Sequence, residues 1–173
     1  MKNNDSIQDA YFNECIKKAI RIISAHDTSV NALLKKLNQT YTLEQCKSTI
    51  LFLQNNGYLN EEKCAFELGS VYIRKANKGP EFIRKALREK LFDETIVENT
   101  ITRLFKETPE AVLALKCVQK KFSAAEKKFS GNTDNYYEKI SVFLKVFLER
   151  NGFTQDICDK VVDEFIASHL DTL

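Results

Sequence analysis

LREKLFDETIVENTITRL (residues 87–104) and LERNGFTQDICDKVVDEF (residues 148–165) align without a gap at a shift of 61 residues. Their apolar positions coincide: Phe92 with Phe153, Ile96 with Ile157, Ile101 with Val162, and Leu104 with Phe165. Apolar residues at this spacing form one face of an α-helix. The two stretches therefore predict the same structure twice, a helix end, a turn and a following helix.

The same unit recurs earlier in the chain. At a shift of 51 residues, the apolar positions Cys46, Ile50 and Leu53 fall on Val97, Ile101 and Leu104. Units of this size bury their apolar faces by stacking on neighbours. We therefore predict an all-α fold of three tandem three-helix repeats, covering residues 1–58, 59–107 and 108–173, that form an elongated, curved array. A single compact bundle is the alternative.

Helix boundaries follow from capping residues and apolar spacing. The first helix is predicted over about 8–25 and the short second helix after a cap at Asp27 or Thr28. The remaining starts are predicted at Thr42, Asn60, Pro80, Asp93, Pro109 after a Thr108 cap, Asp134, and Thr154 or Asp156. The predicted stops are Gly57, Lys78-Gly79, Leu91, the turn at residues 130–133, and Gly152.

Composition favours helices and an intracellular setting. Of 173 residues, 43% are hydrophobic and 29% charged, with only 5 Gly and 2 Pro, which argues against a loop-rich or collagen-like chain. The first residues, MKNND, lack the features of a signal peptide. No apolar run approaches the roughly 20 residues of a membrane span. These features predict a soluble cytoplasmic protein that does not bind a membrane.

The cysteines and histidines predict neither a metal site nor an enzyme. The five Cys form no CxxC pair and fit apolar helical stripes, so we expect reduced, buried thiols, with a zinc site or redox switch as the alternative. His26 and His169 have no spaced catalytic partner, and we expect them at the surface or at helix ends. No Gly-rich phosphate loop is present, and carboxylate pairs stand at helix starts. We expect a non-enzyme without a cofactor.

Positive charge is concentrated in the middle of the chain although the net charge is only +2. Residues 74–90 hold seven basic and two acidic residues, residues 116–128 are also basic, and residues 149–173 carry a net charge of −4. Such a cluster suits an acidic partner surface or a phosphate backbone, although a solvated face is the simpler alternative. The candidate binding residues are Arg74, Lys75, Lys78, Arg84, Lys85, Arg88, Lys90, Lys120 and Lys121.

Residues 52–96 hold a distinctive set of positions: Leu53, Gly57, Tyr58, Leu59, Asn60, Ala65, Arg74, Lys78, Gly79, Ile83, Leu87 and Lys90. With these positions the stretch resembles the signature of the RecX family, bacterial regulators of the recombinase RecA. Residues 147–162, with Gly152 and Phe153 in the turn, resemble the end of the third repeat of that family. The chain departs from the pattern at Cys64, at Asn151 and at Leu91, where the family has a glycine, so that this helix end must close without one.

The resemblance implies three tandem three-helix repeats and a non-enzymatic function. It implies a monomer that binds the RecA filament, with single-stranded DNA within or beside it, and modulates or inhibits its ATPase, strand-exchange and coprotease activities in DNA repair and the SOS response. A helical module that binds nucleic acid directly, without a recombinase, is the alternative from the residues alone. Simple DNA-binding proteins are usually more basic than +2, which favours the first hypothesis.

Overall fold

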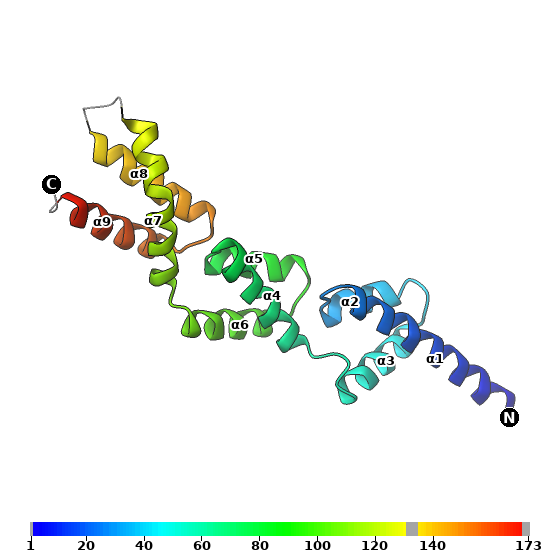
Figure 1. Cartoon of the computed structure of the whole chain (residues 1–173). Coiled ribbons are helices and arrows are strands. Elements are labelled where there is room, and N and C mark those ends of the chain that lie inside the picture. The colour runs from blue at the N-terminus through cyan, green and yellow to red at the C-terminus, as the bar shows by residue number, and fades with distance from the viewer. Residues whose placement is uncertain (1, 131–134, 171–173) are drawn as a thin grey trace. The chain divides into compact units, whose positions relative to one another are not determined.

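The computed structural model describes residues 2–130 and 135–170, with side chains from residue 11 onward. All regular structure in these ranges is helical, which confirms the all-α prediction (Figure 1). The helices are α1 Lys2–Ala25, α2 Val30–Leu37, α3 Leu43–Asn55, α4 Glu61–Ala76, α5 Pro80–Glu89, α6 Glu94–Glu107, α7 Glu110–Phe129, α8 Tyr136–Arg150 and α9 Gln155–Leu170.

Several helix ends have the predicted capping chemistry. The Thr42 hydroxyl accepts a hydrogen bond from the backbone N–H of Gln45, whose side chain accepts one from the Thr42 N–H, which makes a capping box. The Asn60 side chain accepts from the Lys63 N–H at 2.9 Å at the start of α4. Gly57 follows α3 with a φ of 73°, the left-handed conformation expected of a glycine stop.

Other boundaries differ from the predictions. Ser29, and not Asp27 or Thr28, caps α2, because its hydroxyl accepts from the Ala32 N–H at 3.1 Å. Pro109 has a ψ of 135° and precedes α7 as its N-cap, so that it is not the first helical residue. Helix α1 begins at Lys2 and α5 ends at Glu89. The predicted turn at residues 131–133 and the start at Asp134 lie outside the described residues.

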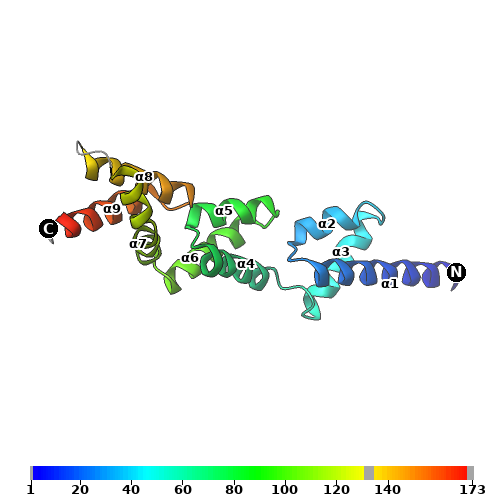
Figure 2. The same ribbon diagram turned by 45° about the horizontal axis from the view of Figure 1, so that its top comes forward.

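The chain divides by its internal contacts into two compact units, which we describe separately. Unit 1 comprises Met1–Leu68 and Leu87–Thr100, and unit 2 comprises Gly69–Ala86 and Ile101–Leu173. In unit 1, helices α1, α2 and α3 pack around one apolar core (Figure 2). The core residues are Cys15, Ala19, Leu33, Leu37, Cys46, Ile50, Leu53 and Leu59. The predicted division into three repeats stays a prediction.

In unit 2, helices α7, α8 and α9 pack against one another (Figure 1). The α8 residues Ile140, Leu144 and Leu148 are fully buried, at the i, i+4, i+8 spacing of a core stripe. Lys145 joins α8 to α9 through ion pairs with Asp159 and Asp163, each at 2.9 Å. These hydrogen-bonded pairs raise the pKa of the Lys145 ammonium group.

The thiols lie mostly in these cores. All five cysteines are unbridged; four are buried and Cys64 is half-buried. Burial raises the pKa of the Cys158 thiol to about 12, with the carboxylates of Glu149 and Glu110 adding to the rise. A thiol with so high a pKa holds very little thiolate at neutral pH. The buried position of these four residues agrees with the apolar stripes on which the sequence places them.

Candidate functional site

Gly79 and Gly152 meet in unit 2, where the turn after α8 lies against the start of α5. The Gly79 N–H donates to the Asn151 carbonyl at 2.9 Å, and the Glu81 N–H donates to the Gly152 carbonyl at 2.9 Å. A Cβ atom on Gly79 would lie 2.3 Å from the Gly152 oxygen, and one on Gly152 would lie 2.3 Å from the Phe82 nitrogen. Backbones that approach so closely exclude every side chain, so both positions require glycine.

Lys78 stabilises this junction. Its ammonium group donates to the Asn151 side-chain oxygen at 2.8 Å and lies 4.5 Å from the centre of the Phe82 ring. The Phe82 ring in turn packs edge-to-face on Tyr72, with 5.4 Å between their centres. Lys78 is half-buried in this position. The structure thus gives a local structural role to one residue that the sequence offered as a binding contact.

A similar junction lies in unit 1, where the turn after α5 meets the start of α2. The Ser29 hydroxyl donates to the Lys90 carbonyl at 2.6 Å, and the Asn31 side chain donates to the Leu91 carbonyl at 3.1 Å. Leu91 has a φ of 62°, so the residue that replaces the family glycine keeps a left-handed backbone. An L-residue with a side chain is strained in that conformation.

Glu61 closes the same region of unit 1. Its carboxylate accepts a hydrogen bond from the Val30 N–H at 3.0 Å, which satisfies a donor in the first turn of α2. Burial raises the pKa of the Glu61 carboxyl, and the nearby Asp93 charge adds to the rise, although the hydrogen bond from Val30 opposes it. The first helical residue of α4 therefore has a carboxyl group that is partly removed from water.

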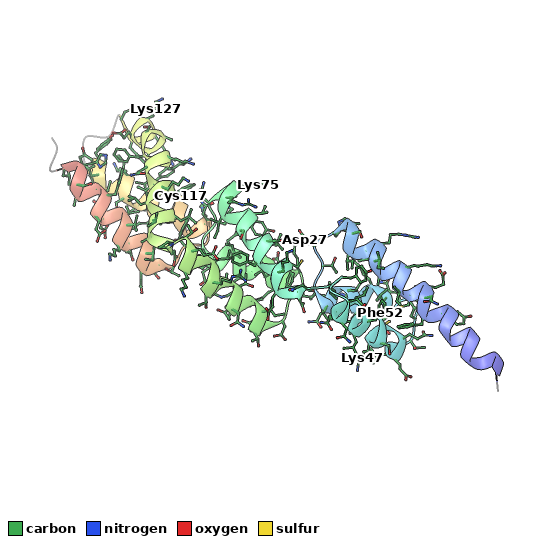
Figure 3. All side chains as sticks on the ribbon, turned by 60° about the horizontal axis from the view of Figure 1, so that its bottom comes forward. Asp27, Lys47, Phe52, Lys75, Cys117 and Lys127 are labelled. Carbon is green, nitrogen blue, oxygen red and sulfur yellow. The ribbon has the colours of Figure 1, made fainter. Side chains whose placement is uncertain are left out.

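The basic residues predicted as one binding face have different environments. The Arg84 side chain is only 18% exposed and pairs with Glu81. Arg88 pairs with Glu94, where its Nε donates at 2.9 Å, and with Glu98 at 3.6 Å. The exposed candidates are Arg74, Lys75, Lys85, Arg88, Lys90 and Lys120, and Lys75 is labelled in Figure 3. The ion pairs reduce the positive charge that Arg84 and Arg88 present to a partner.

Lys121, the remaining candidate, leads to a surface that the sequence did not reveal. Its ammonium group lies 5.3 Å from the centre of the Phe147 ring and 5.7 Å from that of Phe143. These residues line a groove of about 730 Å³ along α7 and α8 in unit 2. We call this surface the α7–α8 groove and define it by Lys121, Lys128, Phe129, Glu138, Lys139, Val142, Phe143, Val146, Phe147 and Arg150.

The histidines, cysteines and carboxylates are the other side chains that could take part in chemistry. Within it, no group of three or more His, Cys, Asp or Glu side chains is placed to hold a metal ion. His169 packs against the Phe122 and Phe165 rings, and its Nδ1 lies 3.0 Å from the Phe165 carbonyl oxygen. None of the described helices is both long and apolar enough to cross a membrane. The class that the described helices define is an all-α protein with exposed basic and apolar surfaces.

Comparisons with known proteins support a particular family within that class. The regulatory protein RecX of Clostridioides difficile (strain 630) is 22% identical over 160 residues, which cover 92% of this chain and 72% of that protein. A crystal structure of RecX from Lactobacillus salivarius has a TM-score of 0.76 at 19% identity and covers 88% of this chain and 95% of that one. No family model matches the chain.

A second crystal structure, of a regulatory protein RecX, has a TM-score of 0.64 at 21% identity and covers 93% of this chain and 78% of that one. The two crystal structures share the fold, and the curated relative is similar in sequence over most of the chain. The curated relative agrees with the resemblance to RecX predicted from residues 52–96, and the two crystal structures show that the fold is the one found in RecX proteins.

Proposed function

We propose that this protein regulates the recombinase RecA by binding the RecA–DNA filament. In this proposal it modulates or inhibits the ATPase, strand-exchange and coprotease activities of the filament, and so acts in DNA repair and the SOS response. The observation that carries the proposal is the similarity to RecX, in sequence over 92% of the chain and in fold. Binding as a monomer in the cytoplasm, with single-stranded DNA as part of the bound surface, belongs to the same proposal.

We also propose that the filament is bound by a chain of three-helix repeats. The two junctions support repetition, because Leu91 and Gly152 are 61 residues apart and both are left-handed, with φ of 62° and 80°. Their carbonyl oxygens both accept hydrogen bonds from the start of a preceding short helix, from Asn31 and from Glu81 respectively. Repeats that contact only their neighbours present the extended surfaces with which such proteins bind large partners.

The exposed cations would make the electrostatic part of this contact. Arg74, Lys75, Lys85, Lys90 and Lys120 are exposed, and an exposed ammonium or guanidinium group attracts acidic side chains and phosphates alike. Arg84 and Arg88 remain candidates, but their ion pairs would have to open or to be shared with the partner. Replacing Lys85 and Lys90 by Ala should therefore weaken filament binding and leave helical content unchanged.

The test is ATP hydrolysis by RecA on single-stranded DNA, measured while this protein is added below the concentration of RecA. We expect hydrolysis to fall, and we expect the K85A/K90A variant to require a higher concentration for the same effect. The K17A/K36A variant, which removes two charges from α1 and α2, is the matched control. Binding to bare single-stranded DNA as tight as to filament, with hydrolysis unchanged, would favour the direct nucleic-acid hypothesis instead.

A further inference from the structure

Helix α8 carries two apolar stripes, although a helix at the surface of a domain needs only one. The first, Ile140, Leu144 and Leu148, is fully buried in the core of unit 2. The second is offset by two residues, and its members Val142 and Val146 are 58% and 36% exposed. The Phe143 and Phe147 rings beside it are half-buried. An additional apolar stripe with a groove along it is typical of a surface that contacts another molecule.

The charges that border the groove have one predominant sign. Lys121 and Lys128 line it from α7, and Lys139 and Arg150 line it from α8, whereas Glu138 is the one carboxylate among its described lining residues. The Lys128 ammonium group lies 4.5 Å from the centre of the Phe143 ring and Lys121 lies near Phe147, so cations stand directly beside apolar surface. A partner that fits must therefore combine apolar and negative groups.

The geometry points to an acidic amphipathic helix of a protein partner as the occupant of the α7–α8 groove. Val142 and Val146 are one turn apart, which matches apolar residues at i and i+4 of a helix lying along α8. From Lys139 to Arg150 the stripe is about 16 Å long, or about three helical turns. Lys121 and Lys128 are seven residues apart, so acidic side chains about two turns apart on the partner reach both.

A protein helix fits these residues better than single-stranded nucleic acid does. Base stacking requires the open face of an aromatic ring, but the Phe143 ring is half-buried and already has the Lys128 ammonium group beside it. Val142 and Val146, the most exposed apolar residues of the groove, offer no surface for stacking. The inference deepens the proposed function. It rests on that function in assigning the bound helix to the recombinase of the filament.

The probe is a fluorescein-labelled helical peptide of about 15 residues, with Leu along one face and Glu on both sides of it, measured by fluorescence anisotropy with the full chain. The comparison peptide has Gln in place of every Glu. We expect the acidic peptide to bind at least about tenfold more tightly than the Gln peptide, and Val142→Glu to weaken its binding at least about tenfold. Lys128→Glu should reduce the preference for the acidic peptide.

Val112→Glu is the matched control, because Val112 is a 61% exposed valine of α7 that does not line the groove. Circular dichroism establishes that each variant keeps its helical content. The inference is overturned if V142E binds the peptide as wild type does. It is also overturned if light scattering shows a dimer that V142E dissociates, or if an oligothymidylate depends on Val142 while the peptide does not bind.

The RecA ATPase assay separates this inference from the proposed function. If V142E loses both peptide binding and the effect on hydrolysis while V112E keeps both, the helix belongs to the recombinase, as inferred. If V142E loses peptide binding but affects hydrolysis as wild type does, the recombinase is not the source of the helix, and the proposed function stands. If the wild type binds the peptide but leaves hydrolysis unchanged, the groove stands and the proposed function fails.

Discussion

Replacing Gly152 by Ala should break the junction between the turn after α8 and the start of α5. Gly152 has a φ of 80°, and a Cβ atom there would lie 2.3 Å from the Phe82 nitrogen, 2.5 Å from its Cβ and 2.8 Å from its Cα. Two of these three atoms are backbone atoms, so no rotation of a side chain relieves the overlap. The turn must move away from α5, and the hydrogen bonds from Gly79 to Asn151 and from Glu81 to Gly152 are strained or lost.

The expected loss of stability has two parts. A left-handed backbone at an alanine costs about 1 kcal/mol relative to glycine. Each backbone hydrogen bond contributes about 1 kcal/mol net, and two are at risk, which gives about 3 kcal/mol in total. Gly57→Ala is the matched control, because Gly57 is also left-handed, with φ of 73°, and nothing lies within 4 Å of its Cβ position. That variant should lose only the first part, about 1 kcal/mol.

Urea unfolding followed by circular dichroism at the helical band measures both variants, since the chain has no Trp to report by fluorescence. The difference between G152A and G57A, about 2 kcal/mol, isolates the close approach of the two backbones from the conformational strain. If the two variants lose the same stability, the junction contributes nothing beyond the left-handed residue, and the reasoning from the Gly152 contacts is refuted.

Three further predictions concern charge and thiol chemistry. Burial raises the pKa of Glu61 above its ordinary 4.5, so the charged carboxylate disfavours folding and the free energy of unfolding falls as the pH rises from about 4. Urea midpoints should therefore show that Glu61→Gln becomes more stable relative to wild type between about pH 4 and pH 7. Lys145→Met should lower the free energy of unfolding by about 1 kcal/mol in low salt and by less in about 1 M NaCl, because salt screens the ion pairs of Lys145. Urea midpoints at the two salt concentrations measure the difference. Iodoacetamide at about pH 8 should modify half-buried Cys64 well before Cys158, whose pKa is about 12, as peptide mass mapping of the native protein will show.

The helices could be predicted because their signals are local. Apolar spacing and a capping side chain lie within one or two turns, as at Thr42 and Gly57, so the sequence contains both the helix and its end. The predicted cap of α2, Asp27 or Thr28, is wrong because Asp27, Thr28 and Ser29 can all cap a helix. A distant contact selects among them: the Ser29 hydroxyl donates to the Lys90 carbonyl, 61 residues away.

The candidate site was harder to predict because charge pairing depends on turns. The Arg84–Glu81 pair has i, i+3 spacing and could have been expected from helix geometry. The pair of Arg88 with Glu94 forms across the turn between α5 and α6, where no helical periodicity applies. The α7–α8 groove has a partial signal, since Val142 and Val146 are apolar residues outside the core stripe of α8. The α7 cations Lys121 and Lys128 lie beside these valines only because α7 and α8 pack together, which no local sequence pattern predicts.

The residues that carry the family resemblance and the residues that can carry its function are largely different sets. Gly79, Gly152 and Lys78 match the family pattern, and each is engaged in a junction within unit 2. Substituting any of them is expected to weaken the fold, because each makes a close contact within that junction. The exposed cations and the α7–α8 groove contribute little to the buried core, so a variant there can lose partner binding and still unfold normally. Loss of function with a normal urea midpoint is therefore the result that identifies a contact residue in this protein.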